Sequence, residues 1–183
     1  MPYVPIAIIL TLLCVPAVHA QAVPAPELSV GSAAPDFSLP FANRDSVGFG
    51  DISLSQYTGK KNVILAFYPA DWSSGCTREV CSFRDNFEDL GRMDVEILGI
   101  SGDSPYSHHE WARLHNLPFL LLSDNRHTVA PLYHSYNPTS GYNKRSVFIV
   151  NKEGNIAYIN LAYSTKDTTS LEKLKQALSE INP

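Results

Sequence analysis

The sequence predicts an α/β fold in which helices cover a central β-sheet. Short apolar runs alternate with amphipathic stretches from about Gly31 onward, a pattern typical of this fold class. Residues 62–68 are almost continuously apolar, as expected of a central strand that is buried on both faces. With 183 residues, 44% of them apolar, the chain is long enough for one domain with a real core and leaves little room for a second.

A helix is expected to follow the central strand closely. The strand ends at Pro69, and after a short loop the helix runs from about Cys76 to Leu90. Ser73 or Ser74 can cap the beginning of this helix, and Gly91 is placed to end it. Its apolar face repeats at spacings of three and four and consists of Val80, Phe83, Phe87 and Leu90.

The second half of the chain continues the alternation of strands and helices. Ser104 and Pro105 open another helix, which runs to about His115. Further strands are expected at 95–100, 119–122, 147–150 and 156–161. The last two form a hairpin that turns at 152–155. A final helix begins near Thr168, and its buried side consists of Leu171, Leu174, Leu178 and Ile181.

The first 20 residues are expected to be a secretory signal peptide. An apolar stretch from Ile6 to Val18 leads into Val18-His19-Ala20, a small-residue cleavage pattern, and no Lys or Arg occurs before Arg44. The segment before the apolar stretch carries no basic side chain, which departs from the usual signal. A membrane anchor is the alternative, although the stretch is shorter than the roughly 20 residues that a spanning helix needs.

Cleavage after the leader would give a secreted or periplasmic protein. Its mature chain would begin with a flexible lead-in, residues 21–30, followed by the folded domain, residues 31–183. Cys14 would be lost with the leader, so only Cys76 and Cys81 would remain. The net charge of −4 does not indicate the basic surface that a nucleic-acid or anionic-membrane binder needs. Small molecules or proteins are therefore the expected partners.

The positions of Cys76 and Cys81 in the expected helix suggest reactivity. At the first turn of a helix, unpaired backbone N–H groups and the positive end of the macrodipole favour the thiolate of Cys76. A five-residue step along a regular helix separates two Cα atoms by roughly 8–9 Å. A disulfide bond usually needs a Cα separation below about 7 Å. The spacing therefore predicts a switch between a helical dithiol and a locally unwound disulfide.

The segment around Cys76 resembles the active site of the peroxiredoxins. Pro69-x-x-x-Ser73-x-x-Cys76 is similar to the pattern Pro-x-x-x-Thr/Ser-x-x-Cys of that family. The stretch 75–81 resembles the bacterioferritin-comigratory or Q-type subfamily, whose resolving cysteine lies five residues after the peroxidatic one. Similarity to the family extends over most of the mature chain, at 31–39, 101–119, 121–124 and 144–150.

The resemblance implies a thioredoxin-like fold, with a central mixed β-sheet flanked by helices, and a thiol-dependent peroxidase acting on hydrogen peroxide and organic hydroperoxides. Cys76 would be the peroxidatic residue that becomes a sulfenic acid, and Cys81 the resolving residue that closes an intramolecular disulfide. Ser73 and Arg145 would position the peroxide, and Pro69 would shield the sulfenate. A dithiol of thioredoxin type would reduce the disulfide. No cofactor or metal is implied, and Q-type relatives are often monomers.

Some residues near the cysteine depart from the family pattern or leave two interpretations open. Ser73 replaces the commoner Thr, and Ser74 stands where the Q-type pattern often has Pro, so the loop is expected to be less rigid. Tyr68 either lines the substrate site or only packs. Glu79 either orients Arg145 or is an ordinary helix charge, and it is not included in the expected catalytic set.

Two other function classes share the thioredoxin-like fold. An exported thiol–disulfide oxidoreductase generally carries Cys-x-x-Cys, and an exported copper-binding protein carries Cys-x-x-x-Cys with a histidine, whereas four residues separate Cys76 from Cys81. Five histidines downstream of the pair keep the copper alternative open; of these, His108 and His109 are expected to face solvent. A binding domain stapled by one disulfide is the remaining alternative, but it gives no reason for the residues that match the peroxiredoxin pattern.

Overall fold

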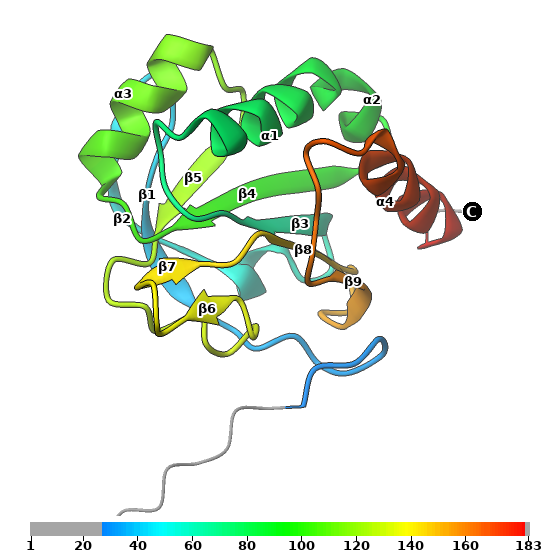
Figure 1. Ribbon diagram of the computed structural model, residues 1–183. Helices are drawn as coiled ribbons and strands as arrows, with labels where there is room; N and C mark the ends of the chain where they lie inside the picture. The colour runs from blue at the N-terminus through cyan, green and yellow to red at the C-terminus, as the bar shows by residue number, and fades with distance from the viewer. Residues whose placement is uncertain (1–26, 182–183) are drawn as a thin grey trace, which may run out of the picture.

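A mixed seven-stranded β-sheet forms the centre of the computed structural model, which describes residues 27–181 (Figure 1). The strands are β1 Ser38–Ala42, β2 Val47–Ser53, β3 Asn62–Phe67, β4 Val95–Ser101, β5 Leu120–Ser123, β8 Ser146–Val150 and β9 Ile156–Asn160. Their order across the sheet is β2-β1-β5-β4-β3-β8-β9. β3, β4 and β5 run parallel to one another, and the remaining neighbours are antiparallel. The mixed sheet implied by the resemblance is confirmed.

The described residues also form four α-helices, a short 3₁₀ helix and a small hairpin. The helices are α1 Ser74–Asp85, α2 Phe87–Gly91, α3 Pro105–His115 and α4 Thr168–Ile181, with the 3₁₀ helix at Leu54–Tyr57. The hairpin strands are β6 Tyr136–Asn137 and β7 Tyr142–Asn143. Figure 1 shows α1 and α3 on one face of the sheet and the hairpin on the other.

The two faces of β3 contribute to separate apolar cores. All six residues of this strand are buried, as the sequence predicts. Ile64 and Ala66 belong to the core that α1, α3 and α4 cover. Leu65 and Phe67 belong to the opposite core, which includes Tyr133 from the segment before the small hairpin. The central strand is therefore held from both sides, which gives the loop that leaves it a rigid base.

The register of the sheet brings the beginning of β8 next to the end of β3. Phe67 pairs with Ser146 in the antiparallel ladder, so Arg145 lies level with Tyr68, where the chain leaves the strand. Because β3 and β4 are parallel, the loops that follow both strands emerge at the same edge of the sheet. The loop 68–73, the beginning of α1 and Arg145 therefore meet at this edge.

The prediction of a single helix at 76–90 is wrong, because the chain forms two helices, α1 and α2, in this region. Ser73 caps the beginning of α1 and is one of the two capping residues, Ser73 and Ser74, that the sequence predicts. Asn86 interrupts the helix with a φ of −106° and a ψ of 10°. Its side-chain amide donates to the Ser82 carbonyl at 2.9 Å, and short polar side chains that bond the backbone in this way compete with regular helix.

The β1–β2 hairpin at one edge of the sheet was not predicted from the sequence. Pro40 lies within β1, and Gly48 and Gly50 lie within β2, and these residue types normally argue against a strand. The ladder accommodates the proline through an irregularity between Pro40 and Ala42. The other expected strands and the helices beginning at Pro105 and near Thr168 are confirmed to within two residues.

The chain is hydrogen-bonded to the sheet region from about Gly31 onward. The Gly31 N–H donates to the Ile156 carbonyl at 2.8 Å, and the Ala34 N–H donates to the Gly154 carbonyl at 2.9 Å. The expected leader, residues 1–20 with Cys14, lies outside the described residues, as does most of the lead-in. Between residues 27 and 181, no helix is both long and apolar enough to cross a membrane.

Candidate active site

Cys76 lies in the first turn of α1, at the edge of the sheet where β3 ends. The turn is held by Ser73, whose hydroxyl oxygen accepts a hydrogen bond from the Cys76 N–H at 3.3 Å. The Cys76 side chain is completely buried. The helix beginning directs its unpaired N–H groups and the positive end of its dipole towards this part of the chain, as the sequence predicts.

Arg145 supplies a second positive charge at the sulfur. Its Nη2 lies 3.4 Å from Cys76 Sγ, and its Nη1 donates to Glu79 Oε2. Gly75 permits this approach, because a Cβ on that residue would lie 3.2 Å from Arg145 Nη2. The structure thus brings Arg145 beside Cys76, and a cation beside a helix N-terminus is an environment that stabilises a thiolate.

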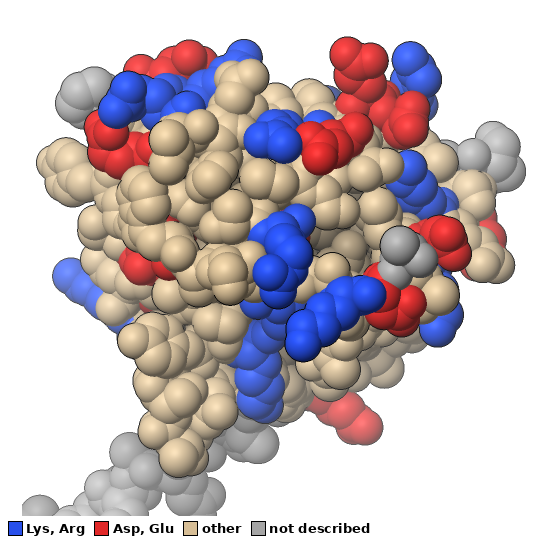
Figure 2. Space-filling view, turned by 45° about the horizontal axis from the view of Figure 1, so that its top comes forward, with Lys and Arg blue, Asp and Glu red and all other residues tan. Residues whose placement is uncertain are grey.

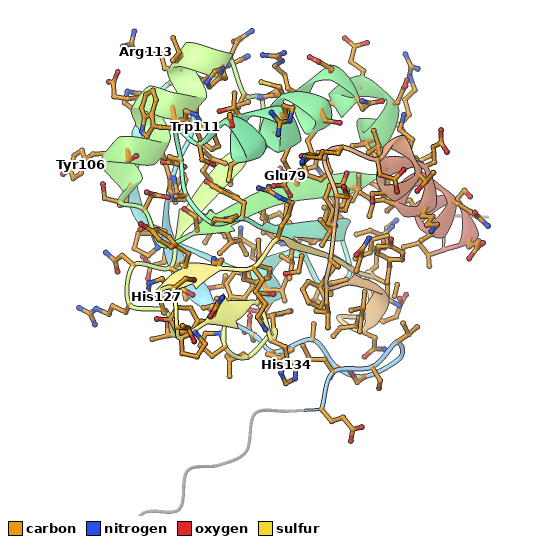
Figure 3. All side chains as sticks on the ribbon, in the orientation of Figure 1. Glu79, Tyr106, Trp111, Arg113, His127 and His134 are labelled. Atoms are coloured by element: carbon orange, nitrogen blue, oxygen red, sulfur yellow. The ribbon has the colours of Figure 1, made fainter. Side chains whose placement is uncertain are left out.

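Glu79 is a buried partner of the site that the sequence analysis left aside. Its side chain lies beneath α1, between the helix and the sheet (Figure 3), and the residue is 1% exposed. Its ion pair with Arg145 fixes the guanidinium beside Cys76. The spacing from Cys76 to Glu79 is three residues, which places both side chains on one face of a helix, and this signal could have identified Glu79.

The other expected site residues lie in the loop between β3 and α1. Ser73 is exposed, and its hydroxyl donates to the Ala70 carbonyl at 3.3 Å while it caps the helix. Pro69 is half-buried at the beginning of the loop. Trp72, between them, is 54% exposed and has a φ of 62°, in the left-handed region that a bulky side chain rarely adopts. Its indole N–H donates to Ser107 Oγ at 3.1 Å, which ties the loop to the beginning of α3.

Cys81 lies on the same helix but faces a different neighbour. Its Sγ is 4.0 Å from Nδ1 of His115, at the end of α3, and both residues are half-buried. Cys76 and Cys81 are both free thiols. Because both lie within the regular helix α1, their sulfurs are held apart by the helix itself. The structure therefore brings Cys76, Ser73 and Arg145 together and keeps Cys81 separate from them.

A buried polar network fixes the loop from behind. Asp71 is at its centre, and its carboxylate accepts from the Tyr68 hydroxyl at 2.9 Å and from Ser107 Oγ at 2.7 Å. His108 Nδ1 lies 3.0 Å from the same carboxylate. The backbone N–H of Asp71 donates to Asp103 Oδ2 at 2.8 Å. Asp71 thus joins the loops after β3 and β4 and the helix α3, through its carboxylate and its backbone N–H.

The position of His108 corrects the expectation that it faces solvent. The side chain is fully buried, and its Nε2 donates to the Leu122 carbonyl at 3.2 Å. Tyr68 is also fully buried and packs at a centroid distance of 5.5 Å from Trp111, so it supports the loop as a packing residue. Burial, followed by the nearby Asp71 carboxylate, raises the pKa of Tyr68 well above its usual range.

Replacing His108 with alanine is expected to lower the free energy of unfolding by about 3 kcal/mol, because the change removes a fully buried side chain and leaves the Asp71 carboxylate and the Leu122 carbonyl without this hydrogen-bond partner. Urea denaturation followed by circular dichroism measures the loss. His109→Ala is the matched control, since His109 is the next residue on α3, is half-buried and bonds the Asn43 carbonyl instead. A loss no greater for His108→Ala than for His109→Ala would contradict a structural role for the network.

Basic side chains gather on the helical face of the molecule (Figure 2). Figure 2 brings the helical face towards the viewer and shows Lys and Arg side chains gathered near its centre, with most acidic side chains at its periphery.

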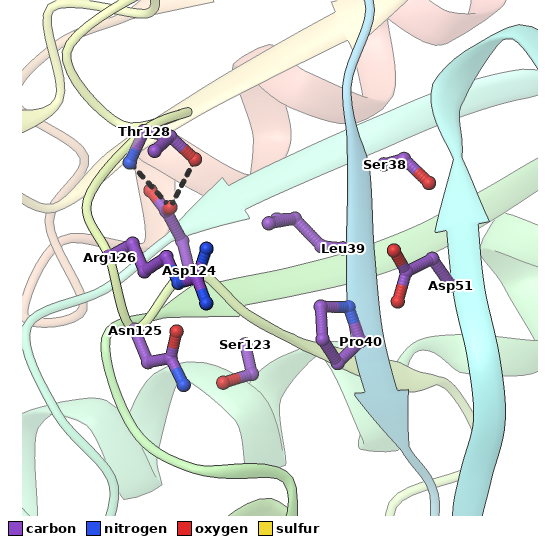
Figure 4. A pocket seen from close by; sticks show the side chains of 9 residues that line it. All are labelled: Ser38, Leu39, Pro40, Asp51, Ser123, Asp124, Asn125, Arg126 and Thr128. Atoms are coloured by element: carbon purple, nitrogen blue, oxygen red, sulfur yellow. Dashed lines mark hydrogen bonds between the residues drawn. The ribbon is translucent and has the colours of Figure 1, made fainter.

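A cavity of about 410 Å³ lies elsewhere, between the β1–β2 hairpin and the segment after β5 (Figure 4). Its lining does not include either described cysteine, so the reactive thiols lie outside this cavity.

Comparisons with known proteins identify the family of the chain. Residues 30–159 match the AhpC/TSA family. The chain is 37% identical over 135 residues to peroxiredoxin Bcp of Bacillus subtilis, covering 70% of this chain and 82% of that protein. It is 39% identical over 134 residues to the chloroplastic peroxiredoxin Q of rice, Oryza sativa subsp. japonica, covering 73% of this chain but only 59% of the rice protein.

Solved structures give the same result for the fold. Peroxidoxin BcpB from Mycobacterium tuberculosis superposes with a TM-score of 0.75 at 25% identity, over 86% of this chain and all of that one. The reduced 2-Cys peroxiredoxin of Plasmodium vivax gives a TM-score of 0.73 at 26% identity, over 82% of this chain and 96% of that one. The thioredoxin-like fold expected from the sequence is therefore confirmed.

Proposed function

Because this chain belongs to the AhpC/TSA family, as a thiol-dependent peroxidase of the Bcp/Q peroxiredoxin type, we propose that it reduces hydroperoxides with Cys76 and closes a disulfide to Cys81 in each turnover. The observation that carries this assignment of roles is the contact of Cys76 Sγ with Arg145 at the beginning of α1. The family match favours this peroxidase over a thiol–disulfide oxidoreductase or a copper-binding protein.

The first step is attack of the Cys76 thiolate on the terminal peroxide oxygen. The O–O bond breaks, the sulfur becomes a sulfenic acid, and the leaving oxygen takes up a proton to become an alcohol, or water when the substrate is hydrogen peroxide. Arg145 stabilises the thiolate and the charge that grows on the leaving oxygen. The Ser73 hydroxyl gives its hydrogen to Ala70, so it is left with an acceptor position for the O–H of a hydroperoxide. Pro69 shields the sulfenic acid from further attack.

The second step is attack of the Cys81 thiolate on the Cys76 sulfur. The hydroxide of the sulfenic acid leaves and becomes water with the proton that the Cys81 thiol gave up, and a dithiol reductant of thioredoxin type later reduces the resulting disulfide. The first turn of α1 has to unwind, because a regular helix holds the two Cα atoms too far apart for a bond. Unwinding breaks the Ser73 cap and the Arg145 contact, both of which involve Cys76 itself. The enzyme therefore alternates between a wound dithiol and an unwound disulfide.

We further infer that the enzyme acts outside the cytoplasm, after removal of residues 1–20. The support is the small-residue cleavage pattern that ends at Ala20. Intact mass spectrometry of protein exported by its native host tests the cleavage and the disulfide together. We expect the mass of a chain that begins at Gln21, and a loss of two hydrogens after one equivalent of peroxide. A retained leader would contradict export by cleavage and leave the peroxidase mechanism intact.

Arg145→Gln is expected to lower the second-order rate constant of peroxide reduction about 100-fold, because one preorganised charged donor at the reacting atoms is lost. Rapid mixing of the reduced protein with hydrogen peroxide measures this rate in a single turnover. Arg78→Gln is the matched control, since Arg78 is an exposed arginine on α1 near the same loop. Equal rates in the two variants would contradict a direct role for Arg145. Because Arg145→Gln leaves Glu79 buried without its ion pair, Arg145→Gln/Glu79→Gln should be measured as well.

A further inference from the structure

The thiol of Cys81 lies against a side chain to which the peroxidase cycle above gives no role. His115, in the last turn of α3, places its Nδ1 4.0 Å from Cys81 Sγ. This is the long end of the range of hydrogen bonds to sulfur, and the two residues are 34 positions apart in the sequence. The contact therefore depends on the packing of α1 against α3 and is not a consequence of chain proximity.

The surroundings fix the imidazole in this position. Trp111, one turn earlier on α3, meets the His115 ring edge to face at a centroid distance of 5.9 Å. Arg84, on α1, donates from Nη1 to the His115 carbonyl at 2.8 Å, which joins the end of α3 to the helix that carries Cys81. A ring that is packed on one side and tied through its own backbone keeps Nδ1 directed at the sulfur.

We propose that His115 is a catalytic base that takes the proton of Cys81 when the disulfide forms; this inference rests on the proposed role of Cys81 as the resolving residue. A thiol is a poor nucleophile, and only its thiolate attacks the sulfenic acid efficiently. With the ring hydrogen on Nε2, the lone pair of Nδ1 accepts the Cys81 hydrogen. His115 thus acts on a reacting atom.

The proton transfer and the later bond change balance without any added reagent. The Cys81 thiol passes its proton to His115 Nδ1, and the thiolate forms a bond to the Cys76 sulfur. The bond between that sulfur and the hydroxyl oxygen breaks, and the departing hydroxide takes the proton from the imidazolium to become water. The Cys76 sulfur is reduced from the sulfenic acid to the disulfide level, and the Cys81 sulfur is oxidised to the same level.

The charges that face the pair favour this transfer. His115 lies at the C-terminal end of α3, where the negative end of the helix dipole stabilises an imidazolium. Arg84 lies near the Cys81 sulfur, and the pKa of its guanidinium is raised chiefly by the hydrogen bond to Asp85, so it stays a positive charge beside the thiolate that the transfer creates. Asp85 pairs with Arg84 at 2.8 Å and offsets its repulsion of an imidazolium. On the other side, Arg44 bonds the side chain of Asn116, the residue after His115.

The base can act only if Cys81 keeps its place while the disulfide forms. The contacts that hold the first turn of α1, from Ser73 and Arg145, all involve Cys76 or its immediate neighbours. Cys81 lies further along α1, beside Val80 and Phe83, which are buried in the core. Unwinding therefore brings Cys76 towards a resolving thiol that stays against His115.

The test separates the two chemical steps by intact mass in acid-quenched samples. After rapid mixing with one equivalent of hydrogen peroxide, the sulfenic acid appears as the gain of one oxygen and the disulfide as the loss of two hydrogens. In His115→Gln we expect the first step at the wild-type rate and disulfide formation slowed about 100-fold near neutral pH. The difference should shrink above about pH 9, where an ordinary thiol ionises without a base. Imidazole added to His115→Ala should restore part of the rate.

His109→Gln is the matched control, because it removes a half-buried histidine of the same helix that bonds Asn43 instead. Wild-type rates of disulfide formation in both His115→Gln and His115→Ala would overturn the inference. Cys81→Ser distinguishes this failure from failure of the proposed function. If Cys81→Ser accumulates the sulfenic acid, Cys81 remains the resolving residue; if Cys81→Ser still loses two hydrogens, the proposed function and the inference fall together.

Discussion

Replacing Cys76 with serine is expected to abolish peroxide consumption completely. A serine hydroxyl stays protonated beside Arg145 and cannot form the sulfenic acid on which turnover depends. The variant should fold, because serine is nearly isosteric with cysteine and Arg145 can donate to the new oxygen. Peroxide consumption by the leaderless protein with an excess of a small dithiol measures the loss, and circular dichroism verifies the fold.

The matched control for this experiment is the other cysteine of the same helix. Cys81→Ser removes a thiol that does not contact Arg145 and should still reduce one equivalent of peroxide. Full activity in Cys76→Ser would show that another group attacks the peroxide and would overturn the mechanism.

Replacing Cys81 with serine is expected to leave the first reduction intact and to stop steady turnover with a protein dithiol as the reductant. The Cys76 sulfenic acid then has no partner on α1 and accumulates, which intact mass spectrometry detects as one added oxygen. A small thiol should restore turnover, because it can reach the sulfenic acid and form a mixed disulfide.

Two results would contradict this role for Cys81. Unchanged steady turnover of Cys81→Ser with a protein dithiol would show that the disulfide is not required. A first reduction slowed as much as in Cys76→Ser would show that Cys81 acts in the peroxide step itself. Both variants should be compared at equal protein concentration, because a disulfide between two molecules would depend on that concentration.

The reactive segment could be predicted from the sequence because its determinants are local. A buried apolar run, a proline, a serine cap and a cysteine at a helix start follow one another within 62–76, and each acts through the backbone next to it. The family resemblance added Arg145, which is distant in the sequence. The structure supplied the physical reason, since the pairing of β3 with β8 places this arginine at the end of the central strand.

The residues that sequence reasoning missed depend on tertiary partners. His108 was predicted to face solvent. Its burial depends on a partner, Asp71, that lies 37 residues away and that the local sequence does not reveal. The same holds for His115, whose neighbour Cys81 is 34 residues away. The β1–β2 hairpin was missed for another reason: Pro40 lies in a strand whose ladder is irregular next to it, a local exception to a statistical rule.

The left-handed backbone of Trp72 has an energetic consequence for the catalytic cycle. A bulky residue held at a φ of 62° raises the free energy of the wound dithiol by about 1 kcal/mol. If unwinding releases this strain, the equilibrium shifts about five-fold towards the unwound form. The hydrogen bond from the Trp72 indole to Ser107 stabilises the wound form and so opposes this shift. Trp72 therefore acts on the equilibrium in two opposite ways: its strained backbone favours unwinding, and its indole hydrogen bond favours the wound form.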